Sequence, residues 1–472
     1  LSLQTKKYKN AIEHFKKIVE MDGNNVSALN NIGIAFKELN DYQNAEDYFK
    51  KVIFINPNHI QAINNLGNVY LRMKNFDEAI NIYKKAIKIK PDFIDANKNL
   101  GIAFKNIGDL DNSEKYYEIA LNLDPSNPYI NYGLSFVLLS KGKFDQGFKK
   151  YEYRKKINKQ NQKLNSQEWI GESLEKKTIL ILTEQGIGDV IQFARYLFEL
   201  KKIKAEKIIL KTNKKLIHLF KNENFKVISE DEKIPFHDYY QYLLSLPGIF
   251  YKLNKKFSSE INFINYKEDL HLYWNKKIQN IKGFKVGISW QGSKNYNDDY
   301  LRSIPVKYFE SLFNLDNISF INLQKGFGLE QLKNLKSKNL LYDFSSEVDN
   351  GQNAFEDTIA IIKNLDLVIT SDTSLVHLSS TLKINTWLLL HYMPDWRWLL
   401  KKDNLVKKIN EKFHRKETLL YSFSHFDLNT DIFYLKVRRK NFPKQKWLNI
   451  SKFTNSQLPT VMKKIIEKSL IS

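Results

Sequence analysis

The chain has 472 residues, of which 42% are hydrophobic and 13% aromatic, and a net charge of +22 from 74 basic and 52 acidic side chains. This length exceeds one hydrophobic core, so we expect two or three domains, and the apolar content excludes an intrinsically disordered chain. The sequence has no cysteine, which excludes disulfides, thiolate metal sites and a cysteine nucleophile. No apolar run is long enough to span a bilayer, and the first residues lack the apolar core of a signal peptide. We therefore expect a soluble cytoplasmic protein, or one held at the periphery of the inner membrane.

The positive charge is concentrated toward the C-terminus. Residues 401–472 carry 17 basic and 6 acidic side chains, half of the excess of the whole chain. Such a basic segment could bind a polyanion. The chain as a whole is rich in lysine, asparagine and isoleucine, which favours a general compositional bias as the simpler explanation. We therefore do not expect nucleic acid as a partner, although steep salt dependence of binding to any duplex would reveal it.

The first third of the chain repeats with a period of 34 residues. Residues that open a helix recur at this spacing, and small residues, then aromatic residues, follow them at fixed offsets. The three series are Tyr8, Tyr42, Phe76, Leu110 and Phe144; Ala11, Ala45, Ala79, Ser113 and Gly147; and Phe15, Phe49, Tyr83, Tyr117 and Tyr151. Gly33, Gly67 and Gly101 fall in the other helix of each unit, and Gly23, Pro57, Pro91 and Pro125 fall at the breaks between units. The pattern predicts two helices per unit, which must stack on their neighbours to bury an apolar face.

This pattern resembles the tetratricopeptide repeat over residues 1–155, without its signature tryptophan. The resemblance implies an α-solenoid whose concave surface binds a peptide or a partner protein. A spacer or a dimerisation arm would show the same pattern. Because the chain starts at the second helix of a unit, we expect further repeats upstream, or a fragment of a longer protein.

After a polar linker at 156–176 the pattern changes to short apolar strands that alternate with helices. One series of strands begins with "KTILILT", "KIIL" and "KVIS", and a second contains "FKVGISW", "ISFINLQ", "LDLVIT" and "NTWLLL". Alternation of this kind predicts parallel sheets covered by helices. We expect two Rossmann-like α/β domains, at 177–275 and 276–400, that bind a ligand outside the carboxyl ends of their strands.

The first strand-to-helix turn reads "TEQGIGD". Gly186 and Gly188 allow a tight turn and the close approach of another group, and Asp189 falls near the start of the following helix. The dinucleotide-binding and P-loop patterns both fail here, because the third glycine position is Ile191 and no lysine follows the second glycine. Asp189 could act in a reaction, or it could simply cap its helix.

Three further loops follow predicted strand ends. "TSDTSLVH" places Thr373, Ser374 and His377 in the first turns of a helix capped by Asp372 or Ser371, a pattern typical of phosphate binding. The other two loops carry the cations Lys294, Arg302 and Lys325. Arginine in particular suits a phosphate ligand. The simpler alternatives are a structural histidine and ordinary surface-loop cations. The run "NDD" at 297–299 is interpreted as a loop, and we expect no metal site.

Together, residues 165–400 resemble the heptosyltransferase-like domain of glycosyltransferase family 9, which has the GT-B fold. The motifs that carry the resemblance are "EQGIGDVIQFARYL", "SLPGIF", "GISWQGS", "RSIP", "LQKG", "DTSLVHL" and "PDWRWL". The resemblance implies transfer of a sugar from a nucleotide-diphosphate donor, with inversion and without a metal or other cofactor. It makes 177–275 the acceptor-side domain and 276–400 the donor-binding domain.

The family's site residues then fall on positions of this sequence. Asp189 would be the general base, and Arg302 would bind the donor phosphates together with Lys325. Asp372, Thr373, Ser374 and His377 would contact the donor sugar and its diphosphate. The repeats would recruit a protein or glycan acceptor. The alternative is a repeat scaffold that carries a non-catalytic, nucleotide-sugar-binding remnant, because residues 401–472 diverge from the family.

Overall fold

The structure is a computed structural model that describes residues 2–158, 164–221, 223–254, 256–258, 263–294, 296, 299–337, 340–390, 394–398, 418–419 and 436–437. The chain forms two compact units. Unit 1 comprises Leu1–Asn161 and Asp395–Arg397, and unit 2 comprises Gln162–Pro394 and Trp398–Ser472. Each unit has hydrophobic clusters of its own.

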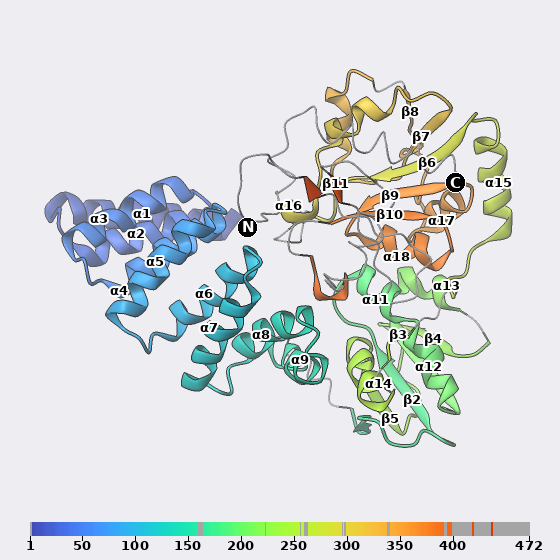
Figure 1. Ribbon diagram of the computed structural model, residues 1–472, viewed down its shortest axis with the longest axis horizontal. Helices are drawn as coiled ribbons and strands as arrows, with labels where there is room; N and C mark the ends of the chain where they lie inside the picture. Colours follow the sequence, from blue (N-terminus) through green and yellow to red (C-terminus); the bar gives the residue numbers. More distant parts are fainter. Residues whose placement is uncertain are drawn as a thin grey trace. The chain divides into compact units, whose positions relative to one another are not determined.

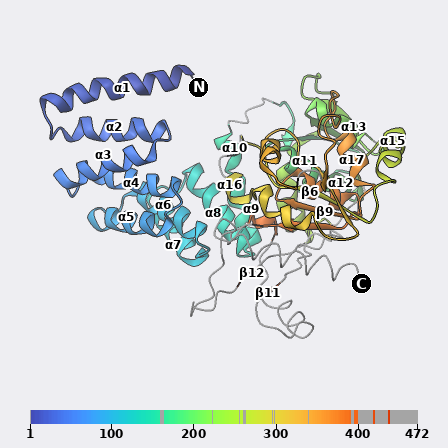
Figure 2. The same ribbon diagram turned by 90° about the horizontal axis from the view of Figure 1, so that it is seen from above.

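Unit 1 is a helical repeat solenoid. Its helices lie side by side in antiparallel rows, as the view from above shows for α1, α2 and α3 (Figure 2). The helices are α1 (Ser2–Met21), α2 (Val26–Glu38), α3 (Tyr42–Ile55), α4 (Ile60–Arg72), α5 (Phe76–Ile89), α6 (Ile94–Asn106), α7 (Leu110–Leu123), α8 (Pro128–Ser140), α9 (Phe144–Tyr151) and α10 (Arg154–Ile157). Four of the five predicted helix starts coincide with observed ones; the exception, Tyr8, lies inside α1.

Glycine lets the two helices of each repeat approach closely. A Cβ atom on Gly67 would lie 2.4 Å from the ring of Tyr83, which is closer than two carbon atoms can pack. The same contact recurs one repeat earlier and one later, between Gly33 and Phe49 and between Gly101 and Tyr117. The glycine and aromatic positions of the 34-residue period are therefore the two sides of one repeated packing contact.

The first sheet of unit 2 is entirely parallel, with the strand order β1-β5-β2-β3-β4. Its strands are β1 (Gln167–Glu168), β2 (Thr178–Leu182), β3 (Lys207–Thr212), β4 (Lys226–Ser229) and β5 (Tyr239–Tyr242). Three of them coincide with predicted strands. β5 lies between the two predicted series of strands and was not predicted, and β1 lies in the predicted linker.

The second sheet is also parallel, with the order β10-β9-β6-β7-β8. Its strands are β6 (Phe284–Ser289), β7 (Ile318–Asn322), β8 (Leu341–Tyr342), β9 (Leu367–Ser371) and β10 (Thr386–Leu389). All four predicted strands of this series are present, and β8 adds a short edge strand. The core of this half contains Val286, Trp290, Phe309 and Ile369.

The helices of unit 2 lie between these strands in the chain (Figure 1). They are α11 (Ile187–Phe193), α12 (Tyr196–Lys202), α13 (Ile217–Phe220), α14 (Leu246–Asn254), α15 (Glu268–Ile278), α16 (Asp299–Arg302), α17 (Glu356–Ile362) and α18 (Ser374–Thr381). Short 3₁₀ helices occupy Lys214–Leu216, Leu243–Ser245, Val306–Tyr308, Glu310–Leu312, Leu329–Asn334 and Trp396–Trp398.

Both sheets reverse their strand order at an internal pair of strands. In the first, the chain runs from β2 outward through β3 and β4, then returns to pair β5 with the other side of β2. In the second, β6 and β9 form the equivalent pair. Ligands of doubly wound α/β folds bind outside the carboxyl ends of the strands at such a reversal. The loops after β2, β6 and β9 therefore lie where a fold of this kind binds its ligand.

The domain limits differ from the predicted ones in two places. α15 spans the expected boundary at 275/276 but packs with the second sheet's half, since Trp274 donates to Asp357 Oδ1 (2.8 Å) and Asn275 donates to Asn364 (2.7 Å). The predicted linker 156–176 contains β1 and the fully buried Trp169, so its second half belongs to the first sheet's core. Residues 401–472 lie outside the described residues except for β11 (Thr418–Leu419) and β12 (Lys436–Val437), which pair in antiparallel fashion.

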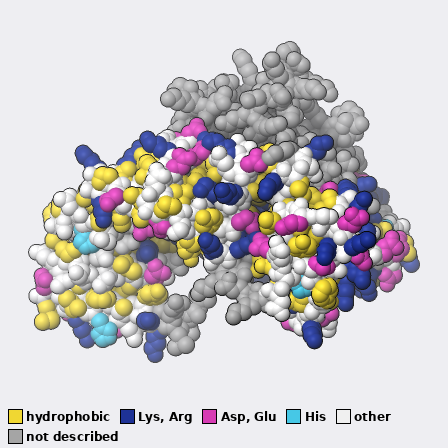
Figure 3. Space-filling view, turned by 90° about the horizontal axis from the view of Figure 1, so that it is seen from below, with side chains coloured by type: hydrophobic (Ala, Val, Ile, Leu, Met, Phe, Trp, Pro, Cys, Tyr) yellow, Lys and Arg dark blue, Asp and Glu magenta, His cyan; other side chains and the backbone are white. Residues whose placement is uncertain are grey.

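Charged side chains of both signs are interspersed over the face of the molecule that Figure 3 shows. Among the residues that the structure describes, no helix is both long enough and apolar enough to cross a bilayer.

Candidate functional site

The turn after β2 brings Asp189 to the carboxyl edge of the first sheet. Gln185 adopts a left-handed backbone conformation (φ 60°) before the helix α11 begins at Ile187. Asp189 is half-buried, and its Oδ2 accepts a hydrogen bond from the backbone N–H of Gly186 at 3.3 Å. The carboxylate therefore braces its own turn. This contact is compatible with both predicted roles of Asp189, as a cap and as a base.

The turn after β9 forms the start of α18. The strand continues through Ser371, so the helix begins at Ser374 and its N-cap is Thr373, not Asp372 or Ser371 as the sequence suggested. Thr373 Oγ1 accepts from the N–H of Leu375 at 3.4 Å and lies 3.2 Å from Thr370 Oγ1. Ser374 lies in the first turn of the helix and is partly exposed.

These two turns meet. A Cβ atom built on Gly188 would lie 3.4 Å from Cα of Ser374 and 3.5 Å from the ring of His377. The start of α11 thus touches the start of α18. Figure 1 shows these two helices between the two sheets. The strand-order reversals of the two sheets therefore bring Asp189 and Thr373 to one place.

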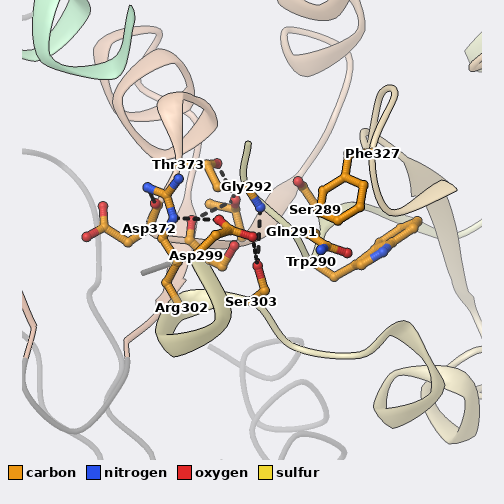
Figure 4. A network of polar contacts seen from close by, with 12 residues as sticks. Ser289, Trp290, Gln291, Gly292, Asp299, Arg302, Ser303, Phe327, Asp372 and Thr373 are labelled. Carbon is orange, nitrogen blue, oxygen red and sulfur yellow. Dashed lines mark hydrogen bonds and ion pairs between the residues drawn. The ribbon is translucent and has the colours of Figure 1, made fainter. Parts of the chain in front are cut away.

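Arg302 reaches the same turn from the loop after β6. Its Nη1 donates to the backbone carbonyl of Asp372 at 2.7 Å, and its Nε donates to Asp299 Oδ1 at 2.9 Å (Figure 4). The guanidinium also lies over the ring of Tyr296, 4.6 Å from its centre. Of its five N–H donors, these two hydrogen bonds use two. The remaining donors are held in a fixed orientation beside the start of α18.

Asp299 explains how Arg302 is held. It is buried, begins the short helix α16, and accepts from both Arg302 and the hydroxyl of Ser303, the latter at 2.6 Å. We interpreted "NDD" as a loop, and Asn297 and Asp298 lie outside the described residues. The spacing of an aspartate three residues before an arginine is the signal that sequence reasoning missed.

Lys325 is hydrogen-bonded to another loop of the protein, and Lys294 is exposed to solvent. The Lys325 ammonium donates to the backbone carbonyls of Val348 and Asp349, the latter at 2.6 Å. Two of its three N–H groups are thereby used within the protein. Lys294 is exposed. Their predicted contacts with phosphate remain predictions.

Gln324 connects two of the loops, a role that we did not predict although the residue lies in the motif "LQKG". Its Oε1 accepts from Ser289 Oγ (2.9 Å) and from the N–H groups of Trp290 (3.2 Å) and Gln291 (3.0 Å). Its Nε2 donates to carbonyls of Gln291 and Phe327. The side-chain amide of Gln324 thus links the loop after β6 to the loop after β7.

Asp372 and His377 share an aromatic neighbour, Trp398. The indole N–H donates to Asp372 Oδ2 at 3.0 Å, and the indole ring stacks on the His377 imidazole with ring centres 5.4 Å apart and planes 4° apart. Burial raises the pKa of Asp372, opposed by the Trp398 hydrogen bond and by Arg302. Burial, with the charge of Arg195, lowers the pKa of His377 to about 3. His377 is therefore a neutral, buried ring near pH 7.

A metal ion has no evident place in the described part of the chain, where no three His, Asp or Glu side chains gather in a suitable group.

Comparison with known proteins identifies the repeats. Two family models, both described as tetratricopeptide repeat, match this chain, one at residues 26–59 and 60–93 and the other at 94–127. The search of curated proteins found no match. Similar solved structures include MamA (22% identity, 33% of this chain and 92% of that one, TM-score 0.30) and MamA from Desulfovibrio magneticus RS-1 (25%, 34% and 98%, 0.29). A third is YrrB, described as a TPR protein with an unusual peptide-binding site (17%, 32% and 77%, 0.29). The N-terminal unit of this chain contains tetratricopeptide repeats.

Proposed function

We propose that unit 2 is a GT-B glycosyltransferase that moves a sugar from a nucleotide-diphosphate donor to an acceptor hydroxyl with inversion. The observation that supports this most is the contact between Gly188 and Ser374, because it brings an acidic side chain and a helix start to the same place from two different sheets. Two parallel sheets whose strand-to-helix turns meet at this contact fit the GT-B arrangement that the sequence motifs imply.

In the proposed reaction, Asp189 accepts the proton of the acceptor hydroxyl. The acceptor oxygen attacks the anomeric carbon from the face opposite the diphosphate. The bond from that carbon to the diphosphate oxygen breaks, and the nucleoside diphosphate leaves with the electron pair. The configuration at the anomeric carbon is inverted as a result.

The departing diphosphate gains negative charge, which the site can stabilise with fixed groups. The free N–H donors of Arg302 and the N-terminal amides of α18 would serve this purpose. Asp372 and Thr373 would bind hydroxyls of the donor sugar. His377, stacked and neutral, would shape the pocket rather than carry charge, and Lys325 would need to leave its carbonyl partners to reach a phosphate.

The tetratricopeptide repeats support a role in protein interaction. We propose that they recruit a protein or glycan acceptor. The alternative is a scaffold in which unit 2 binds nucleotide sugars without transferring them, and binding without turnover would favour it.

The test is a panel of nucleotide sugars, measured first for thermal stabilisation of the full chain and then for release of nucleoside diphosphate. Asp189→Asn should lower kcat about 10²–10⁴-fold, as expected for loss of a general base. Donor affinity should stay nearly constant, since asparagine can still accept from Gly186.

Asp238→Asn is the matched control. Asp238 also accepts a backbone hydrogen bond, from Thr178 at 2.8 Å, but at the amino end of β2. Its variant should keep full activity. Undiminished turnover in Asp189→Asn would refute the assigned role, and no stabilisation by any donor would refute both the enzyme and the binding remnant.

A further inference from the structure

Trp398 makes two contacts that the proposed reaction does not yet use. The residue is 2% exposed, and its indole N–H bonds one oxygen of Asp372 while its ring covers His377. Tryptophan is the one side chain that offers a large flat aromatic surface together with a single N–H donor. Trp398 uses both properties here, which indicates a role beyond hydrophobic packing.

The Asp372 carboxylate is asymmetric as a result. Oδ2 accepts from Trp398, whereas no described group donates to Oδ1, and Oδ1 is not among the buried atoms that lack a partner. The backbone carbonyl of the same residue is fixed by Arg302. Asp372 is thus held at its backbone and at one oxygen, while the other oxygen has no hydrogen bond within the described part of the chain.

His377 stacks on one face of the Trp398 indole and so helps to hold the indole in place. Its Nδ1 is buried and has no hydrogen-bond partner among the described residues. A neutral imidazole in parallel stacking fixes the plane of the indole without adding a competing charge. The indole plane in turn sets the direction of its N–H.

We propose that Trp398 is a positioning residue that holds Oδ2 of Asp372, so that Oδ1 accepts hydrogen bonds from hydroxyls of the donor sugar. The inference rests on the proposed function, because it assumes a nucleotide sugar at this site. It predicts that Trp398 matters for the sugar part of the donor and not for its diphosphate.

The experiment compares Trp398→Phe with wild type in the full chain by calorimetric titration. Phenylalanine keeps the stack on His377 and removes only the N–H donor. The probes are UDP, ADP and GDP, and the corresponding UDP-, ADP- and GDP-glucose. We expect the affinity for the nucleotide sugar that wild type binds to fall about tenfold, as for a lost hydrogen bond to a charged group. The affinity for the matching nucleoside diphosphate should stay within about twofold.

A pH series separates positioning from a general structural role. Without the indole donor the carboxylate loses a stabilising hydrogen bond, so the pKa of Asp372 rises further. The pH below which the nucleotide sugar no longer binds should therefore move upward by about one unit. Binding of the nucleoside diphosphate should show no such displacement.

Trp396→Phe is the control, since the same change two residues earlier affects a ring that contacts Phe148 and Tyr151 in unit 1. It should bind both probes as wild type does. Equal affinities of Trp398→Phe and wild type for the nucleotide sugar would overturn the inference, and so would an equal loss for both probes. If wild type binds no nucleoside diphosphate and no nucleotide sugar, the proposed function itself fails.

Discussion

Gly188 and Ser374 lie on helices that follow different sheets, yet a Cβ atom on the glycine would be only 3.4 Å from Cα of the serine. The contact is between backbones, so it fixes the spacing of the two helix starts. A methyl group still fits at this distance as an ordinary van der Waals contact, but a longer side chain would have to displace Ser374.

Substitutions of Gly188 should therefore separate by size. Gly188→Ala should change the free energy of unfolding by no more than about 1 kcal/mol, because alanine is at least as good a helix former as glycine. Gly188→Leu should cost about 1–3 kcal/mol through overpacking and weaken binding of nucleoside diphosphates. Denaturant unfolding and calorimetric titration of the two variants measure both effects. Unchanged binding in Gly188→Leu would contradict the idea that the two starts form one site.

His377 should make the stability of unit 2 depend on pH. Its pKa is about 3 in the folded protein, against 6.5 for an unperturbed histidine. Between these two pH values the unfolded state binds a proton that the folded state does not bind. The contribution of His377 to the free energy of unfolding is therefore fully present above about pH 6.5 and is lost as the pH falls. From pH 6.5 to pH 5 the loss should be about 2 kcal/mol.

His377→Gln should remove this part of the pH dependence, as measured by denaturant unfolding at pH 5 and pH 7. Some slope of the same sign should remain, because burial also lowers the pKa of His218. Asp372 acts in the opposite sense, since a raised carboxyl pKa favours the folded state as pH falls. A wild-type slope that persists in full in His377→Gln would show that the buried imidazole is not its source.

The sequence predicted the repeats and most strands well, for a simple reason. Both depend on local periodicity, and a run such as residues 367–371 is buried at every position. β5 was missed because its residues, "YYQY", look polar; Gln241 is buried there only because neighbouring groups bond its amide. Local pattern does not report such compensation.

Local patterns also mark three loops of the candidate site, whose role in binding stays a prediction. The loops after β2, β6 and β9 carry recognisable glycines, cations and hydroxyls. The contact of Trp398 with Asp372 joins residues 26 positions apart in the sequence, and no local pattern marks it. Lys325 had the right residue type in the right loop, yet its ammonium bonds to carbonyls of another loop.

Gln192, on α11, tests how a buried side-chain amide affects the stability of unit 2. It lies one turn after Gly188, is fully buried, and neither its Oε1 nor its Nε2 has a hydrogen-bond partner among the described residues. A buried polar group without a partner costs about 1–3 kcal/mol. Gln192→Leu should therefore stabilise unit 2, by about 1–2 kcal/mol once differences in shape are included.

Gln241 is the matched control, because it is an equally buried glutamine with a bonded amide. Its Nε2 donates to the carbonyl of Trp169 at 2.7 Å and its Oε1 accepts from the N–H of Tyr242 at 2.7 Å. Gln241→Leu removes these two hydrogen bonds and should destabilise the unit by about 1–3 kcal/mol. Denaturant midpoints of the two variants should thus move in opposite directions from wild type. Destabilisation of both by similar amounts would contradict the cost assigned to the unpartnered amide of Gln192.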